Sequence, residues 1–215
     1  MTKQPVERTR TNDPDGTRRR VLEFAEKAFQ ERGYNATSLG DLMKAAGVSG
    51  GALHYHFRNK KAIGLAVINE RVAAAVDETW IVPVSEASSA RDGVRSVFEA
   101  VAAELDAQGF VRGCPLNNLS HELSLADPDF RSALAEVFAK WRGAITEKVK
   151  NDQKNGLESR ETDAERFAIR TIATYSGAMS MAKVEQNSDA LRQCLAGMAH
   201  REDTDQVSVA RIRQL

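Results

Sequence analysis

The chain has 215 residues, 42% of them hydrophobic and 28% charged, which is enough apolar material for one or two folded domains. Five prolines and 14 glycines exclude a fibrous or disordered chain. No apolar run reaches the roughly 18 residues that a membrane span needs. The first 20 residues are polar and basic rather than an export signal, and two cysteines are too few for a disulfide framework. We therefore expect a cytoplasmic protein without a membrane partner.

The charges are unevenly distributed along the chain. The formal net charge is zero, which by itself argues against nucleic-acid binding. However, residues 1–61 contain 12 Lys or Arg against 7 Asp or Glu, whereas the remaining 154 residues contain 18 against 23. An N-terminal part with excess positive charge, followed by a part with excess negative charge, is expected where only the first part binds phosphate.

The apolar residues recur at three- and four-residue steps, and no segment alternates apolar and polar residues for long. This spacing predicts an all-α fold. Glycine, proline and capping residues divide the pattern into about nine helices. We expect them at about residues 15–32, 39–46, 50–56, 60–79, 89–107, 115–125, 128–155, 162–184 and 188–200, with Pro83 marking the end of the fourth.

The turn Gly47–Val48–Ser49, between the second and third helices, is typical of a helix-turn-helix. Gly47 supplies a residue without β-carbon strain, Val48 an apolar plug, and Ser49 a cap for the next helix. Donors suited to phosphate oxygens surround this turn: Thr37, Ser38, Lys44, Tyr55, Arg58, Lys60 and Lys61. The alternative is a plain helical hairpin with a solvated basic rim.

A longer string of residues resembles the TetR family of transcriptional regulators. It comprises Phe29-Gln30-Glu31-Arg32-Gly33-Tyr34, Thr37-Ser38, Ala45-Ala46-Gly47-Val48-Ser49, Leu53-His54-Tyr55-His56-Phe57 and Asn59-Lys60. The resemblance implies a three-helix DNA-binding domain over residues 1–61 and a helical regulatory and dimerisation domain over residues 62–215. It also implies a homodimer on a palindromic operator of double-stranded DNA, a small-molecule inducer, and neither catalysis nor a cofactor.

The resemblance carries DNA-binding roles onto individual residues. Thr37 and Ser38 would contact backbone phosphate, and Lys60 would anchor the next one. The groove-facing set would be Ser49, Gly50, Gly51, Ala52, Tyr55 and His56. Many members carry Lys or Arg at the position of Gly50 and Tyr at that of His54, so this helix is short of bidentate guanine readers. Base specificity then rests on smaller groups, on water, or on a basic arm that enters the minor groove, formed by Arg8, Arg10 and Arg18 to Arg20. The alternative for this arm is a run of solvated charges before a helix.

The second part of the chain contains the aromatic residues that a ligand cavity needs, with Phe98, Trp141 and Tyr175 as candidates. At helical spacing such residues more often form a core. The family resemblance also implies that the last two helices pair with those of a second copy. The small residues there permit close approach, in an interface or in an ordinary core: Ala173, Ser176, Gly177, Ala178 and Ala182.

A cysteine stands at the predicted start of the sixth helix. Pro115 occupies a natural first helical position, which makes Cys114 the N-cap. The helix dipole and Arg112 should lower the pKa of a thiol there. Asn117, Asn118 and His121 follow on successive turns as further candidate ligand or sensor residues. The block resembles a branch of TetR regulators that includes electrophile- and oxidant-sensing repressors. Cys114 is therefore a candidate sensor, with a small buried core residue beside helix-bending asparagines as the alternative.

The sequence leaves two alternative hypotheses about function. Gly47-Val48-Ser49-Gly50-Gly51 fits the G-x-S-x-G pattern of hydrolase nucleophiles, which would make Ser49 catalytic. That elbow must follow a β-strand, and here a helix is predicted. The other alternative is a helical ligand- or stress-sensing module that does not bind DNA. His54 and His56 project to different sides of a helix, so we expect no metal site.

Overall fold

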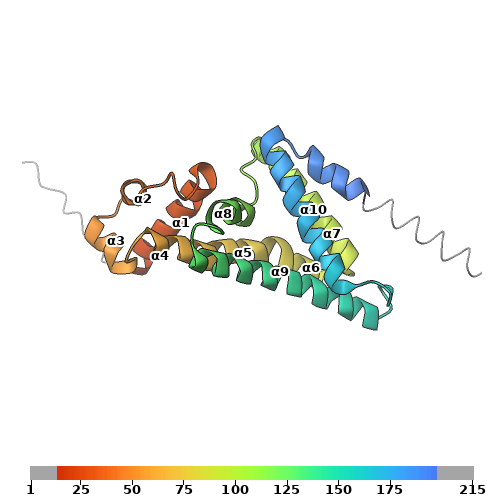
Figure 1. Ribbon diagram of the computed structural model, residues 1–215. Coiled ribbons are helices and arrows are strands. Elements are labelled where there is room, and N and C mark those ends of the chain that lie inside the picture. The colour runs from red at the N-terminus through yellow and green to blue at the C-terminus, as the bar shows by residue number, and fades with distance from the viewer. Residues whose placement is uncertain (1–13, 198–215) are drawn as a thin grey trace, which may run out of the picture.

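The computed structural model describes residues 14–197, and within them every regular element is helical (Figure 1). The helices are α1 (Pro14–Arg32), α2 (Leu39–Ala46), α3 (Gly50–His56), α4 (Lys60–Ala66), α5 (Ala73–Val76), α6 (Val82–Glu86), α7 (Ala90–Gln108), α8 (Pro115–Leu123), α9 (Pro128–Lys154) and α10 (Ala164–Glu185). Two π-helical stretches, η1 (Val67–Val72) and η2 (Asp77–Ile81), join α4, α5 and α6 into one run. With residues 60–86 counted once and the helical residues 189–197 added, the predicted all-α fold of about nine helices is confirmed.

The first three helices form a small unit at one end of the molecule (Figure 1). Helix α1 buries Val21, Ala25 and Phe29, which recur at four-residue steps on one face. Leu42 of α2 and Leu53 of α3 are completely buried in the same core. Since short helices are marginal in water, this shared core is what holds α2 and α3 in place.

The run of residues 60–86, here called the connecting helix, leads from this unit into the rest of the molecule (Figure 1). The sequence predicted that it ends near Thr79 because of Pro83, and this is wrong. Proline lacks an N–H and its ring clashes with the carbonyl four residues earlier in a regular α-helix. The wider π-helical turn of η2 directly precedes Pro83, so the chain accommodates the ring and remains helical to Glu86.

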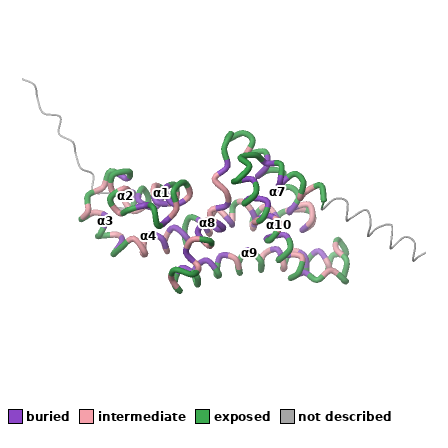
Figure 2. The backbone as a smooth tube through the Cα atoms, turned by 45° about the horizontal axis from the view of Figure 1, so that its top comes forward, coloured by how far each residue is buried: buried purple, intermediate pink, exposed green. Residues whose placement is uncertain are grey.

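Helices α7 to α10 pack around the connecting helix, with α8 and α9 also contacting its first half. Helix α9 runs along it, α10 packs on α9, and α8 lies beside α1 and the connecting helix (Figure 1). The buried segments gather where α8, α9 and the connecting helix meet (Figure 2). One continuous apolar cluster extends from α1 to α10. The two predicted domains, residues 1–61 and 62–215, therefore share this cluster and are not separated by a break in the packing. Within residues 14–197, no helix is both long and apolar enough to cross a bilayer.

Gly64 of α4 lies where the first unit meets α9, and replacing it tests this packing. A β-carbon at Gly64 would lie 2.8 Å from Cε2 of Tyr34 and 2.9 Å from Cε1 of Phe130. We predict that Gly64→Ala lowers the free energy of unfolding by about 1–3 kcal/mol, because both rings must move. The helical Gly143 has no atom within 4 Å of such a β-carbon, so Gly143→Ala should raise it by about 0.5–1 kcal/mol. Urea unfolding at one protein concentration measures both, and equal effects would contradict the packing described.

Candidate DNA-binding surface and effector cavity

Local hydrogen bonds shape the turn between α2 and α3. Ser38 caps α2 in a reciprocal capping box with Asp41, its Oγ accepting from the Asp41 N–H at 3.1 Å. Gly47 ends α2 in the left-handed conformation, with φ +64°. Ser49 then caps α3, accepting from the Ala52 N–H at 3.3 Å. These bonds turn the chain sharply, and with Leu53 buried beneath it one side of α3 faces outward.

The residues predicted to face a DNA groove lie on this outward side of α3. Ser49, Gly51 and Tyr55 are exposed, with Tyr55 79% exposed. Gly50, Ala52 and His56 are half-buried. The set therefore forms one accessible surface, flanked by the exposed Lys44, Ser38 and Arg58. Their contacts with DNA stay a prediction.

Three of the predicted phosphate contacts have other partners. Thr37 is completely buried and its hydroxyl donates to the Gly33 carbonyl at 2.9 Å, so its side chain points into the protein, and its contact with phosphate stays a prediction. The Lys60 ammonium lies 4.3 Å from the centre of the Tyr34 ring and donates to the Asn35 carbonyl at 3.3 Å. Lys61 pairs with Asp127 at 2.6 Å and with Asp129 at 2.7 Å. Both lysines thus stabilise the protein itself, and the phosphate contact of Lys60 remains a prediction.

The basic arm is only partly within the described residues. Arg8 and Arg10 lie outside them. Arg18 forms a bidentate ion pair with Glu70 and its guanidinium lies 5.5 Å from the centre of the Phe57 ring, so it links α1 to the connecting helix. Arg19 and Arg20 are exposed on the outside of α1.

The G-x-S-x-G pattern lies in the turn between two helices and not after a strand. The Ser49 hydroxyl serves as a helix cap. The geometry that makes such a serine nucleophilic, a strained strand-to-helix elbow, is therefore not present here. Among residues 14–197, no three His, Cys, Asp or Glu side chains gather closely enough to hold a metal ion.

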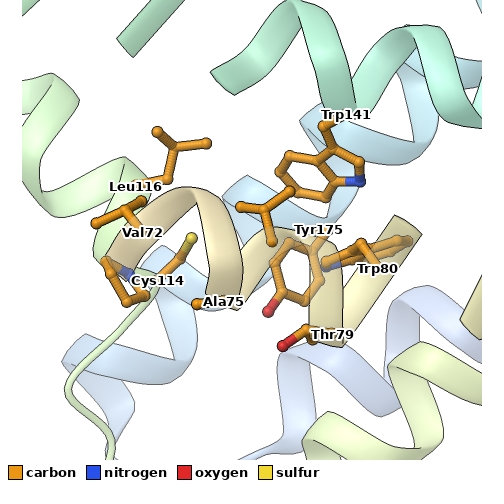
Figure 3. Close-up of a pocket in the computed structure, with 10 residues that line it drawn as sticks. Val72, Ala75, Thr79, Trp80, Cys114, Leu116, Trp141 and Tyr175 are labelled. Atoms are coloured by element: carbon orange, nitrogen blue, oxygen red, sulfur yellow. The ribbon is translucent and has the colours of Figure 1, made fainter. Parts of the chain in front are cut away.

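A cavity of about 50 Å³ lies between η1, α5, η2, α8, α9 and α10. Figure 3 shows Cys114, Val72 and Leu116 grouped on one side of it and Trp80, Trp141 and Tyr175 on the other. None of its ten lining residues is charged. Of the aromatic candidates, Trp141 and Tyr175 line the cavity, while Phe98 stands behind them, its ring centre 5.7 Å from that of Tyr175.

The polar groups of the cavity are neutral ones. Thr79 and Tyr175 each contribute a hydroxyl to the lining (Figure 3). Burial raises the pKa of Tyr175 far above its ordinary value, so its hydroxyl stays protonated. The indole N–H of Trp141 is buried and has no hydrogen-bond partner within the described part of the chain. The cavity therefore offers an apolar wall and a few neutral polar atoms.

Cys114 is the N-cap of α8, as predicted, but the pKa of its thiol is shifted in the opposite direction from the prediction. The residue is only 8% exposed, and burial raises the pKa of the thiol. The backbone N–H groups of Leu116 and Asn117 lower it by less. Arg112 points elsewhere, pairing with Glu31 at 3.0 Å and stacking over Phe110. The predicted low pKa is therefore wrong, because loss of water outweighs the helix terminus.

The polar residues that follow Cys114 hold α8 in place. Asn117 is buried and donates to the Ser176 carbonyl of α10 at 3.3 Å. Asn118 donates to Oε1 of Gln30 at 3.1 Å and accepts from Lys183 at 2.9 Å. His121 is exposed. None of Asn117, Asn118 and His121 lines the cavity, so their placement does not fit the predicted role in ligand sensing.

The contacts of α8 with the first unit were not predicted. Glu122 accepts the backbone N–H groups of Tyr34 at 2.8 Å and Asn35 at 2.6 Å, in the turn between α1 and α2. Gln30 donates to the Gly113 carbonyl at 2.6 Å, one residue before Cys114. Glu122 and Gln30 look like ordinary surface positions in the sequence, and no local pattern distinguishes them. Helix α8 thus contacts both the cavity and the helix-turn-helix unit.

Comparison with known proteins identifies this arrangement. Residues 21–67 match the model of bacterial regulatory proteins of the tetR family, and residues 90–196 match that of the C-terminal domain of LmrA/YxaF-like transcriptional regulators. The transcriptional regulator AcuR of Cereibacter sphaeroides is 30% identical over 75% of this chain and 74% of its own. The chain belongs to the TetR family. It is a DNA-binding transcriptional regulator and not an enzyme.

The likeness to TetR regulators extends through both parts of the chain. The transcriptional repressor DhaR of Mycobacterium sp. strain GP1 is 28% identical over 83% of this chain and 88% of its own. The crystal structure of the reduced form of Escherichia coli NemR superposes with a TM-score of 0.77 at 25% identity, over 84% of this chain and 94% of that one. This TetR regulator therefore shares the architecture of its relatives over nearly their full length.

Replacing Glu122 tests the link between α8 and the α1–α2 turn. We predict that Glu122→Ala lowers the free energy of unfolding by about 1–2 kcal/mol, because two backbone N–H groups lose a charged acceptor. The amide protons of Tyr34 and Asn35 should also exchange faster with solvent. Glu136→Ala removes the same group from an exposed position of α9 and should change neither. Unchanged exchange at both amides in Glu122→Ala would show that the link does not hold the turn.

Proposed function

We propose that this TetR regulator is a cytoplasmic, homodimeric repressor of a palindromic operator. The observation that carries the proposal is the exposed outer side of α3, capped and packed so that its side chains face away from the body. Two relatives, DhaR and NemR, are named transcriptional repressors, which supports repression rather than activation. Residues 1–61 would bind DNA and residues 62–215 would regulate and dimerise.

The outer side of α10 fits the dimer interface. Ile169, Met181 and Val184 are 47%, 53% and 84% exposed, and the exposed Ala173 and Gly177 lie between them on the same helix. Exposed apolar and small residues in a stripe permit close approach of a second helix. Of the small residues considered from the sequence, Ala178 and Ala182 are buried inside the chain and do not belong to this stripe, while Ser176 is half-buried.

The small volume of the cavity and its uncharged lining restrict which inducers can bind. A volume of about 50 Å³ is far below the 300–1,000 Å³ of sites for drug-sized ligands. No charged residue lines it, so a charged inducer would lose its hydration without compensation. We therefore infer a small uncharged molecule, mostly apolar, with one or two polar atoms facing Thr79 and Tyr175.

The effector would act through two routes to the DNA-binding unit. The connecting helix begins at Lys60, next to α3, and passes the cavity at Val72, Val76 and Trp80. Helix α8 passes the cavity at Cys114 and holds the α1–α2 turn through Glu122. Two recognition helices must fit half-sites about 34–36 Å apart or a multiple of this distance, so a small displacement of either unit abolishes joint binding.

Tyr55 provides the test of DNA binding. Tyr55→Ala should weaken binding to the region upstream of the protein's own gene by about tenfold, since a groove or phosphate contact contributes about 1–3 kcal/mol. Its stability should not change, because the side chain is 79% exposed. Leu157→Ala, an exposed residue distant from α3 in the chain, should leave affinity unchanged. Fluorescence anisotropy measures both, with salt-sensitive binding expected for the wild type. If Tyr55→Ala binds the DNA as tightly as the wild type does, the proposal that Tyr55 on α3 contacts DNA is wrong.

Modification of Cys114 is a second route to induction, because its thiol lines the cavity. Reaction needs the thiolate, and burial raises the pKa of this thiol. We predict that its alkylation by iodoacetamide is slower at pH 7 than that of free cysteine. The rate should rise as the pH increases toward the raised pKa, because the thiolate fraction rises with it. Mass spectrometry in a Cys194→Ser background follows the reaction.

Cys114→Ser then separates the two routes. This variant should keep operator binding, because the hydroxyl occupies the same cap position. If covalent modification induces, release by quinones, aldehydes or hypochlorite is lost in the variant. If the cavity alone induces, release by a small neutral ligand persists, and Cys114 has only a packing role.

A further inference from the structure

The connecting helix has a burial pattern that a regular α-helix does not produce. Besides Ile63 and Val67 near its start, its buried residues form a series at every fourth position through 20 residues: Gly64, Ile68, Val72, Val76, Trp80 and Val84. In a helix of 3.6 residues per turn, four residues advance by a turn and about 40°. Five such steps would place Val84 about 200° around the axis from Gly64, on the opposite side. All six positions are nevertheless buried, and the last five belong to one apolar cluster.

Two wide turns restore the alignment. The Ala73 N–H donates to the Ile68 carbonyl and the Val82 N–H to the Asp77 carbonyl, each five residues back. A π-helical turn of this kind is equivalent to one extra residue in an α-helix. Removing two extra residues from 20 leaves about 18, which is five α-helical turns. The buried series at every fourth position is therefore what these two wide turns produce.

Pro83 accounts for η2, but η1 contains no proline. Instead, η1 touches the two parts of the molecule that must communicate. On its exposed side, Glu70 pairs with Arg18 and Arg71 pairs with Glu26 at 2.7 Å, both on α1. On its buried side, Val72 lines the cavity. The wide turn thus joins the cavity wall to the first helix of the DNA-binding unit.

We propose that η1 is a conformational switch: an extra residue held in place by the two ion pairs to α1 and by Val72, which an occupant of the cavity displaces along the connecting helix. Displacing a wide turn rotates the residues it passes by about 100° and shifts them by about 1.5 Å. Glu70 and Arg71 then no longer face Arg18 and Glu26, and α1 is released. The proposal rests on the proposed effector cavity, but the nature of the wide turn can be tested without an effector.

Deletion of Asn69, an exposed residue of η1, is the direct test. If η1 holds one extra residue, the deletion converts it into a regular turn and leaves both flanks in place. The full-length variant should then keep a cooperative urea transition near the wild-type midpoint. It should also bind the upstream DNA within about threefold of wild type. Deletion of Glu136, an exposed residue of the uninterrupted helix α9, rotates everything after it by about 100° and should destroy the transition.

The switch itself is tested with an adduct that occupies the cavity. N-ethylmaleimide forms a bond between Sγ of Cys114 and its ring, the thiol proton passing to the adjacent ring carbon; Cys194→Ser confines the reaction. Mass spectrometry confirms the adduct. We expect it to weaken operator binding at least fivefold in this background and less than twofold when Asn69 is also deleted.

Each outcome decides a different part of the proposal. A deletion at Asn69 as damaging as that at Glu136 would show that η1 holds no extra residue. A folded deletion variant that releases DNA as the parent does, or a modified parent that does not release it, would overturn the switch. A wild type that binds no operator would contradict the proposed function instead, while the two deletions still decide whether η1 is an inserted residue.

Discussion

The surface of α3 that we propose binds DNA depends on the packing beneath it, because a helix of seven residues has little stability of its own. Helix α3 is held by caps at Ser49 and, for the next helix, Asn59, and by Leu53, which is completely buried against α1 and α2. Its outward side is then free to carry small and polar groups, including Gly50 and Gly51, that would weaken an isolated helix. The core of the first unit therefore determines where the recognition surface stands.

That unit is not isolated from the regulatory body. One apolar cluster continues from Val21 through the connecting helix to Leu191. Polar contacts also join the two parts: Glu122 of α8 accepts from the turn between α1 and α2, and Gln30 of α1 donates to the Gly113 carbonyl just before α8. A change in the cavity wall thus has two physical paths to α3, one through the axis of the connecting helix and one through α8.

The sequence predicted well what local chemistry decides. Ser49 and Cys114 are the N-caps of α3 and α8, as predicted, because the start of a helix depends on residues within a few positions. The outward set on α3 followed from the same local geometry together with the family resemblance.

What depends on distant parts of the chain was predicted poorly. The helix terminus at Cys114 suggested a low thiol pKa, but burial by the connecting helix and α10 reverses its direction. Thr37 and Lys60 turn to Gly33 and Tyr34, which no spacing indicates. Pro83 predicts a helix end because local sequence does not indicate the wide turn of η2, which precedes the proline and accommodates its ring.

The central claim is that two copies present α3 to one duplex together. Hydroxyl-radical footprinting of the region upstream of the gene, combined with the stoichiometry of the complex by sedimentation, tests it most directly. The account predicts two protected half-sites one helical turn apart, about 34–36 Å, or a multiple of this distance, with copies bound in pairs. A single protected half-site with one copy bound, at concentrations that saturate the fragment, would contradict it.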